Sequence, residues 1–452
     1  MKNLKYILFV LMTLSLLATA CGSSESNTTA PEPVSTSGST ESNAVEANEQ
    51  EESTVEEVEP VTLTIVHDWE PSSGGTHEAF AGIVEAFMAE NSNIKIVQEI
   101  YANESIPNKI ETAFMAGKEP DVILMNQFNT TRLWLDNGVT VPVQDYLTEW
   151  GMSENYFIQS ALDSYTTDGG DLRAFPLEGF IWPILYRVDV FEAAGVAIPQ
   201  TQEELLAATP ALRAAGYAPF VVGGSDWTGF NFLMLQMQGC MENDEGLELA
   251  TNGGWVDNAN AQRCAEIFVQ MRDNEVFTNG TEGLDNSTML AEFTTDKAAM
   301  MMTGSWSFSD IPDELRENIQ VIGFPPAADS PQEKPILYSS FNAKGVWITR
   351  NGVEKIDPVG KFISFLYKPE NIAKLVEAGM VSPLISVPVD ETKMNPLTIK
   401  GFTLAESSNV LLQPQDFFPA EISGEVGRVL REAYIPNGMS SLDFLEALDA
   451  LY

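Results

Sequence analysis

Three tryptophans stand just after predicted strands, at positions where a side chain can meet a ligand. They are Trp69, Trp227 and Trp306, and each follows its strand in a polar loop. Loops after strands supply ligand contacts more often than cores do, and an indole ring offers a flat apolar face. Packing in the core is the alternative role for each. Trp182 and Trp347 lie within apolar extended runs, so we expect Trp347 in the core and Trp182 in either place.

Polar side chains occur at comparable positions. Glu178 lies in an apolar extended run, where a charge is costly unless a polar group meets it, so it is a candidate ligand contact with an ion pair as the alternative. Asp68 and Asn126 follow predicted strands and would accept hydrogen bonds from hydroxyl groups, with a turn or cap role as the alternative. Aromatic faces combined with carboxylates and amides suit sugars, which have apolar CH faces and a rim of hydroxyls.

The sequence offers little support for catalysis. Its two histidines are His67 and His77, and it contains no GxSxG, no HExxH and no glycine-rich phosphate loop. We therefore expect no catalytic residue, no metal and no cofactor. A pair among the 65 acidic residues could still serve a surface glycoside hydrolase, which is the alternative from another functional class.

Acidic residues dominate the charge of the chain. Lys and Arg number 24 against 65 Asp and Glu, which gives a formal net charge of −41. Such a chain repels phosphate backbones, so nucleic acid is not an expected partner, whereas a cationic solute such as a polyamine is an alternative ligand. The length of 452 residues exceeds what one core usually holds, and we therefore expect two lobes.

The first 20 residues are typical of an export signal. Lys2 and Lys5 precede an apolar run over 6–17, and small residues lead to Cys21. Residues 17–22, LATACG, resemble a bacterial lipobox, so we expect lipid attachment at Cys21 on the outer face of the cytoplasmic membrane. Ordinary signal cleavage after the small residues is the alternative. The segment 21–60 holds ten Glu and no Lys or Arg, which predicts a disordered tether.

Cys240 and Cys264 are the two remaining cysteines, and both lie in the part expected to be exported. An even pair outside the cytoplasm indicates one disulfide that closes the segment between them. Two buried free thiols are the alternative, because spacing alone does not bring the two Cα atoms within bridging distance.

Alternating strands and helices position the first group of candidate side chains. Strands over 61–66, 94–100 and 120–125 are predicted, with helices over 79–88 and 106–116 between them. This order indicates a parallel α/β sheet. Ligands bind beyond the carboxyl ends of such strands, where the segments 67–75 and 126–130 would lie.

The stretch from Leu172 to Leu206 has two halves of different character. Residues 174–186 are rich in aromatic and branched side chains and contain two prolines, which favours extended segments. A short helix over 188–194 follows, and Thr201 with Glu204 predicts a capping box for the next helix. Further on we expect a loop over 223–229, a segment over 339–345 that leads into a strand over 346–349, and helices over 421–434 and 441–451.

Several short motifs follow one another in a characteristic order and spacing. They are PDVI at 120–123, LYRVD at 185–189, PQTQEE at 199–204, TGSW at 303–306, KFISFL at 361–366, KPE at 368–370 and GMVSP at 379–383. Together they resemble the maltose-binding-protein-like family of bacterial extracellular solute-binding proteins, which are the capture subunits of ABC importers for sugars. Arg187 is a departure from the pattern, because the family usually has Asn there.

The resemblance implies an α/β protein with the two-lobed, type II fold of periplasmic binding proteins, in which a hinge joins the lobes and the ligand lies in a cleft between them. Lobe 1 would comprise 61–178 and 340–385, and lobe 2 would comprise 179–339 and 386–452. The chain would cross between the lobes near Glu178, near Phe341 and near Leu384.

The resemblance also implies roles for particular residues. Glu178 would face the cleft, Asn342 and Lys344 would lie at the returning crossing, and Phe417 and Phe418 would supply an aromatic wall. The expected protein is a monomeric receptor that binds a mono- or oligosaccharide and delivers it to the permease subunits of an ABC transporter.

Overall fold

The computed structural model describes residues 60–152 and 154–452. The predicted export signal over 1–20, the lipidation site Cys21 and the tether over 21–60, apart from its last residue, lie outside the described residues. Among the residues that the structure describes, no helix combines the length and the apolar character needed to cross a membrane.

The first sheet begins with three parallel strands, β1 (Val61–His67), β2 (Ile94–Ile100) and β3 (Val122–Met125). β1 lies between the other two and pairs with both of them in parallel. The helices α1 (Gly75–Glu90) and α2 (Ile106–Met115) connect these strands. The predicted alternation of strands and helices and the parallel sheet are therefore confirmed.

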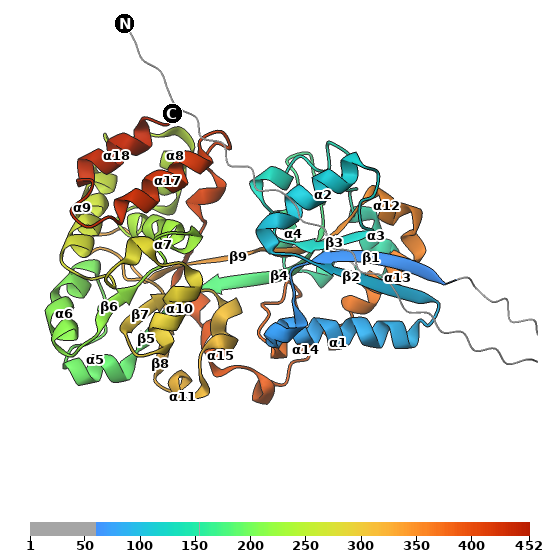
Figure 1. Cartoon of the computed structure of the whole chain (residues 1–452), viewed down its shortest axis with the longest axis horizontal. Coiled ribbons are helices and arrows are strands. Elements are labelled where there is room, and N and C mark those ends of the chain that lie inside the picture. Colours follow the sequence, from blue (N-terminus) through green and yellow to red (C-terminus); the bar gives the residue numbers. More distant parts are fainter. Residues whose placement is uncertain (1–59, 153) are drawn as a thin grey trace, which may run out of the picture. The chain divides into compact units, whose positions relative to one another are not determined.

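Two long strands extend this sheet. β9 (Ile336–Ile348) pairs in parallel with β10 (Asn409–Leu411) near its start and antiparallel with β3 near its end, which gives the order β10-β9-β3-β1-β2. β4 (Phe175–Trp182) runs antiparallel along β9 (Figure 1). The segment over 339–345, which was expected to lead into the strand over 346–349, is itself part of β9, because β4 gives it a partner strand and keeps it extended.

The second sheet has the strand order β6-β7-β5-β8. Its strands are β5 (Ile184–Arg187), β6 (Ala218–Val221), β7 (Ala298–Met302) and β8 (Ile319–Ile322). β6 and β7 pair in parallel, whereas β5 runs antiparallel to both β7 and β8. Because β5 follows β4 directly, the extended character predicted for residues 174–186 is confirmed.

Helices that follow these strands complete the second lobe. They are α5 (Val188–Ala194), α6 (Gln202–Ala214), α7 (Trp227–Gln238), α8 (Asn243–Asn252), α9 (Ala259–Asp273) and α10 (Asn286–Thr294). The capping box predicted for α6 is half formed. Thr201 Oγ1 accepts a hydrogen bond from the Glu204 N–H (3.1 Å), but the Glu204 carboxylate accepts from the Gln200 N–H (2.7 Å) rather than from Thr201.

α7 begins inside the segment predicted as a loop over 223–229. The Asp226 side chain accepts a hydrogen bond from the Thr228 N–H (2.9 Å), so it caps a helix whose first residue is Trp227. Gly223, Gly224 and Gly229 surround this cap, and because glycine is typical of turns, the sequence pattern favoured a loop over a helix start. As a result Trp227 is held on the first turn of a helix rather than on a free loop.

The remaining chain is mainly helical. Its helices are α3 (Gln144–Glu149), α4 (Gln159–Tyr165), a 3-10 helix η6 (Ser305–Asp310), α11 (Asp313–Arg316), α12 (Arg350–Glu354), α13 (Ile356–Leu366), α14 (Pro369–Glu377), α15 (Pro396–Phe402), α16 (Leu404–Ser407), α17 (Ser423–Ala433) and α18 (Ser441–Asp449). α17 and α18 confirm the two helices predicted at the end of the chain. They pack against α7 and α9 respectively (Figure 1).

The buried apolar side chains form separate cores, so the structure is two-lobed. One core draws on residues 63–177 and 346–394 around the first sheet, and it contains the fully buried Trp347, as expected. A second core draws on residues 180–338 and 411–448, with a smaller cluster beside it on the second sheet. The first core includes Met394, which lies beyond the boundary expected at residue 385.

A disulfide joins Cys240, just after α7, to Cys264 in α9, with the two Cα atoms 5.8 Å apart. Arg187 is buried in the same lobe. Its guanidinium donates to both carboxylate oxygens of Asp189 (2.9 and 2.7 Å) and to Asp296 Oδ1 (2.5 Å). Arg187, the residue that departs from the family pattern, therefore has its charge paired within the second lobe, which these bonds stabilise.

Candidate functional site

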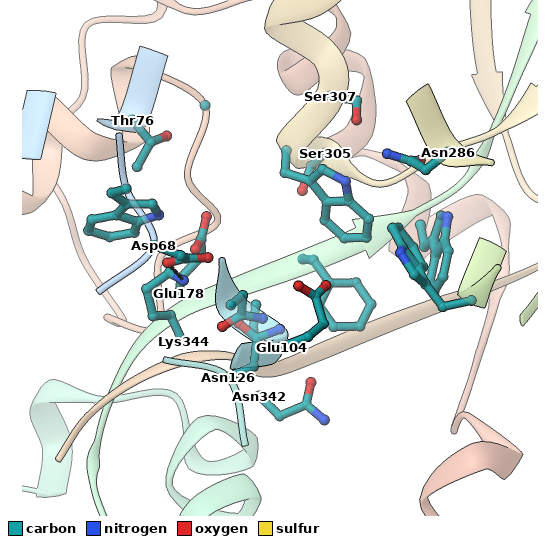
Figure 2. Close-up of a pocket in the computed structure, with 18 of the residues that line it drawn as sticks. Asp68, Thr76, Glu104, Asn126, Glu178, Asn286, Ser305, Ser307, Asn342 and Lys344 are labelled. Atoms are coloured by element: carbon teal, nitrogen blue, oxygen red, sulfur yellow. Dashed lines mark hydrogen bonds and ion pairs between the residues drawn. The ribbon is translucent and has the colours of Figure 1, made fainter. Parts of the chain in front are cut away.

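A cavity of about 940 Å³ lies where elements of both lobes meet. Seven of the nine predicted ligand-binding residues line it, namely Asp68, Trp69, Asn126, Glu178, Trp227, Trp306 and Asn342. Figure 2 shows Asp68, Glu178 and Lys344 gathered at one end of the cavity, and Asn286 and Ser305 at the other end. Residues that are more than two hundred positions apart in the sequence, such as Asp68 and Asn342, therefore share one site.

One side of β4 lines the cavity. Glu178, Phe180 and Trp182 occupy alternate positions of the strand, so their side chains share a face, and all three line the cavity. Gly179 belongs to the opposite face, where an added Cβ would lie 2.6 Å from a ring carbon of Phe341. Glu178 was predicted as a site residue, whereas Phe180 was not. Side chains alternate between the two faces of a strand, so the spacing of two between residues 178 and 180 could have identified Phe180.

Aromatic rings form the wall at one end of the cavity. The ring centroid of Trp182 lies 5.3 Å from that of Trp227 and 5.5 Å from that of Trp306, and the latter two are 5.9 Å apart. Phe180 approaches Trp306 edge to face at 5.6 Å. Trp227 and Trp306 are about 40% exposed, whereas Trp182 is 3% exposed behind them. Trp182 therefore serves both as core and as cavity wall.

Gly304 makes the position of Trp306 possible. The indole ring folds back over the preceding residue, and a Cβ built at Gly304 would collide with three carbon atoms of that ring. The backbone conformation of Gly304 is open to any residue, since its φ is −80°. Space, rather than backbone freedom, is thus the reason for glycine in this motif.

Charged groups form the opposite end. Lys344 is buried, and its Nζ lies 2.6 Å from Asp68 Oδ1 and 5.1 Å from the centroid of the Trp69 ring. Glu178 is the residue directly across from Lys344 in the pairing of β4 with β9. Burial raises the pKa of Glu178 to about 7, although the charge of Lys344 acts in the opposite direction. The Asp68 charge is thus matched by an ammonium, whereas burial disfavours the ionised form of the Glu178 carboxyl that faces the cavity.

His67 holds Trp69 in place. The His67 Nδ1 accepts a hydrogen bond from the Trp69 N–H (3.1 Å), so its other nitrogen, Nε2, donates to Gln98 Oε1 (3.0 Å). Burial lowers the pKa of His67 to about 4, which keeps the ring neutral and in this tautomer. Trp69 is 3% exposed and packs edge to face on Phe80 at 4.9 Å. It therefore contributes one edge to the cavity and the rest of its ring to the core.

The two remaining candidates do not line the cavity. Phe418 is buried in the core of the second lobe, stacked on Trp255 with centroids 6.4 Å apart. Phe417 is 39% exposed and also lies outside the lining. The segment just before them, with Gln415 and Asp416, lines the cavity instead. The structure therefore puts amide and carboxyl groups where the resemblance implied an aromatic wall.

Asp416 connects this segment to the other lobe. Burial raises the pKa of its carboxyl to about 6, against the field of Arg132. The Arg132 guanidinium donates to the Asp416 main-chain carbonyl at 3.4 Å. Elsewhere on the cavity wall, Asp310 lies close enough to His77 for each to influence the pKa of the other. The hydrogen bond from Arg132 and the proximity of Asp310 to His77 thus link the two lobes in addition to the strands β4 and β9.

The chemistry of the lining is that of a binding site for a polar, non-ionic ligand with apolar faces. It combines a wall of indole rings with amides and carboxyls that both donate and accept hydrogen bonds. Among the described residues, no group of three or more His, Cys, Asp or Glu side chains is arranged to hold a metal ion.

Known proteins with similar sequences carry solutes. The bacterial extracellular solute-binding protein family matches residues 73–373. The chain is 25% identical over 401 residues to the alpha-glucosides-binding periplasmic protein AglE of Rhizobium meliloti, with 80% of each chain covered. It is 24% identical over 350 residues to the sn-glycerol-3-phosphate-binding periplasmic protein UgpB of Escherichia coli K12, which covers 73% of this chain and 76% of that one.

A solved structure resembles the whole described part. A probable secreted solute-binding lipoprotein from Streptomyces coelicolor superimposes with a TM-score of 0.75 and 30% sequence identity, covering 87% of this chain and 99% of that one. The family match spans more than half of the sequence, and the two-lobed fold with its interlobe cavity agrees with it. The chain therefore belongs to the bacterial extracellular solute-binding protein family.

Proposed function

We propose that this exported solute-binding protein reversibly binds a neutral mono- or oligosaccharide in the interlobe cavity and delivers it to the permease of an ABC importer. The observation that carries the proposal is the cluster of Trp182, Trp227 and Trp306, which faces the same cavity as the hydroxyl-binding groups of Glu178 and Asn126. Indole faces cover the CH faces of a sugar, and carboxyl and amide groups bind its hydroxyls. The α-glucoside ligand in the name of AglE fits this chemistry.

Two charged ligand classes fit the cavity less well. The phosphate in the name of UgpB calls for several cations, but Lys344 is the one Lys or Arg in the described lining, and it is already paired with Asp68. A polyamine calls for ionised carboxylates along its length. Of the carboxyls in the lining, Asp68 is already paired with Lys344, and burial raises the pKa of Glu178 to about 7, so this carboxyl is only partly ionised near neutral pH. A neutral ligand avoids both difficulties.

A panel of ligands tests the proposal. Thermal unfolding of the purified protein would be measured with neutral sugars, with spermidine and with sn-glycerol-3-phosphate, since a ligand of the folded state raises the melting temperature. We expect a rise with at least one neutral sugar and none with the two charged compounds. Release of free monosaccharide from a bound oligosaccharide would point to a glycoside hydrolase and contradict reversible binding.

We further propose that the mature chain is monomeric and carries lipid at Cys21. The lipobox-like LATACG at residues 17–22 supports the anchor, as does the lipoprotein name of the relative from Streptomyces coelicolor. In cells fed a clickable fatty acid, the wild-type protein should be labelled and recovered in the membrane fraction, whereas Cys21→Ser should be neither. Labelling of Cys21→Ser to the same extent would refute the site.

A further inference from the structure

The strand β2 carries one polar side chain on the face that packs against α1. Side chains alternate along a strand, so Ile94, Ile96, Gln98 and Ile100 share this face, and the first two are buried in the core of the first lobe. A glutamine interrupts the apolar row that a helix covers. Gln98 is also absent from the lining of the interlobe cavity. Packing therefore does not explain an amide at this position, and its hydrogen bond does.

This hydrogen bond joins Gln98 to His67. The Gln98 Oε1 accepts from His67 Nε2 at 3.0 Å, and the His67 Nδ1 accepts from the Trp69 N–H at 3.1 Å. The imidazole ring is fully buried, and Phe80 of α1 packs on it edge to face with the centroids 5.2 Å apart. A neutral imidazole has one donor nitrogen and one acceptor nitrogen. An acceptor at Nε2 therefore selects the tautomer whose Nδ1 can bind the Trp69 N–H.

Trp69 in turn borders the polar end of the cavity. The Lys344 Nζ lies 5.1 Å from the centroid of the Trp69 ring and 2.6 Å from Asp68 Oδ1. Figure 2 shows Asp68 and Lys344 beside Glu178. The two groups that hold the ammonium thus directly follow His67 in the chain. A shift of the main chain at residues 67–69 would move both of them.

We propose that Gln98 is a positioning residue for ligand binding, which acts through the His67 ring to hold Trp69 at the polar end of the cavity without lining the cavity itself. The inference rests on the proposed function, because it concerns the affinity for the ligand of that cavity. Protonation of His67 would undo the arrangement. It would place a donor on Nδ1 opposite the Trp69 N–H, and two donors do not bind each other.

The groups around His67 keep its ring neutral. The Gln98 hydrogen bond and the Asp68 charge favour the imidazolium, whereas Lys344 and His77 oppose it. Burial is the largest effect, and it lowers the pKa of His67 to about 4. A carboxylate in place of the Gln98 amide would accept the same hydrogen bond, but its charge would favour the imidazolium and raise that pKa. Gln98→Glu therefore changes the protonation of His67 while it keeps the hydrogen bond.

Nitrogen NMR of the imidazole rings in the ligand-free protein tests the tautomer. The chain has two histidines, so the spectrum of His77→Gln assigns the signals of His67. We expect the neutral wild-type ring to carry its proton on Nε2 and to titrate near pH 4. In Gln98→Leu the Trp69 amide should exchange with solvent about fivefold faster, because its acceptor is no longer fixed. A proton on Nδ1 of the neutral wild-type ring would overturn the proposal.

Titration calorimetry over a range of pH tests the effect on binding, with glucose, maltose, raffinose, xylobiose and chitobiose as probes. For each sugar that the wild type binds, Gln98→Leu should weaken binding about fivefold at neutral pH. Gln98→Glu should bind like the wild type in mildly alkaline solution. Its affinity should then fall at a pH about one unit or more above that of the wild type, in step with the pKa of His67 measured by NMR. Gln320→Glu, on the exposed side of β8, should match the wild type throughout.

The outcomes separate this inference from the proposed function. Wild-type affinity in both Gln98 variants at every pH would overturn the inference and leave the proposed function intact. The same holds if Gln98→Glu loses affinity equally at every pH, because a structural defect would not follow the protonation of His67. Absence of binding between the wild type and all neutral sugars would overturn both.

Discussion

Single side chains in the cavity differ in how much they also support the fold. Trp306 is 40% exposed and Trp182 is 3% exposed, although their rings touch. We predict that Trp306→Ala lowers sugar affinity at least about tenfold, the equivalent of ~1.4 kcal/mol, with little change in melting temperature. Trp182→Ala should lower both, because it also leaves a void in the core. Calorimetry and thermal unfolding on both variants would check this. A large loss of stability in Trp306→Ala would identify that ring as core.

Glu178 gives the ligand-free protein a particular dependence on pH. Burial raises its pKa from the ordinary value of 4.5 to about 7, so the folded chain keeps this proton over a range in which the unfolded chain releases it. Its contribution to stability is therefore complete below pH 4.5 and is lost as the pH rises through about 7. Glutamine mimics the protonated form and has no such loss.

The prediction for Glu178→Gln follows from that sign. Its free energy of unfolding should match the wild type near pH 4.5 and exceed it above pH 7. Each tenfold difference in proton affinity between the folded and the unfolded chain corresponds to about 1.4 kcal/mol of this gain. Denaturant unfolding at several pH values would measure the difference, with Glu85→Gln on the exposed side of α1 as the matched control. A difference that does not vary with pH would contradict the assignment.

At the scale of elements, the crossing strands β4 and β9 depend on Gly179. A Cβ there would lie 2.6 Å from the Phe341 ring and 2.9 Å from the Ser340 carbonyl oxygen, so one of the two strands would have to move. We predict that Gly179→Ala costs about 1–3 kcal/mol of unfolding free energy and weakens ligand binding as well.

A second glycine provides the matched comparison for this change. Gly82 lies within α1, and a Cβ there meets no atom within 4 Å. Gly82→Ala should therefore stabilise the protein by about 0.5–1 kcal/mol and leave binding unchanged. Equilibrium unfolding and calorimetry on the two variants would decide. The steric argument fails if Gly179→Ala behaves like Gly82→Ala.

Elements with clear periodicity could be predicted, and elements defined by distant partners could not. The strands β1, β2 and β3 and the helices α17 and α18 follow from their apolar spacing alone. In contrast, the segment 339–345 contains Asn, Lys and Gly, and its local pattern does not predict a strand. It is extended because β4, more than 150 positions earlier in the chain, pairs with it. The start of α7 was missed for a similar reason, since glycines surround its Asp226 cap.

The same division holds for the site. Tryptophans and carboxylates after strands could be found, because residue type and local position identify them. Gln413, Gln415 and Asp416 could not, because only the packing of the C-terminal region against α7 brings them to the cavity. The resemblance implies an aromatic wall at Phe417 and Phe418 instead, but Phe418 is buried in the core of the second lobe.

For the molecule as a whole, the disulfide is the one covalent bond in the described residues that closes a loop. It links Cys240 to Cys264, a separation of 24 residues, and a loop of that size stabilises the folded state by about 3 kcal/mol in the chain-entropy description. We predict that replacing both cysteines by Ala lowers the melting temperature, and that a reductant lowers it for the wild type but not for the variant. Equal sensitivity of the two proteins to the reductant would refute a structural bridge.

The first core is built from two separate segments of the chain, and this affects how the protein folds during synthesis and which fragments can fold. The core of the first lobe takes its side chains from residues 63–177 and again from 346–394, and β3 obtains its outer partner only from β9. During synthesis this lobe therefore remains incomplete until most of the chain has emerged, with apolar strand faces open to aggregation in the meantime. A gene fragment that ends before β9 should yield an insoluble product rather than half a receptor. A shortened chain in which residues 63–177 are linked directly to 346–394 should instead fold as the first lobe alone.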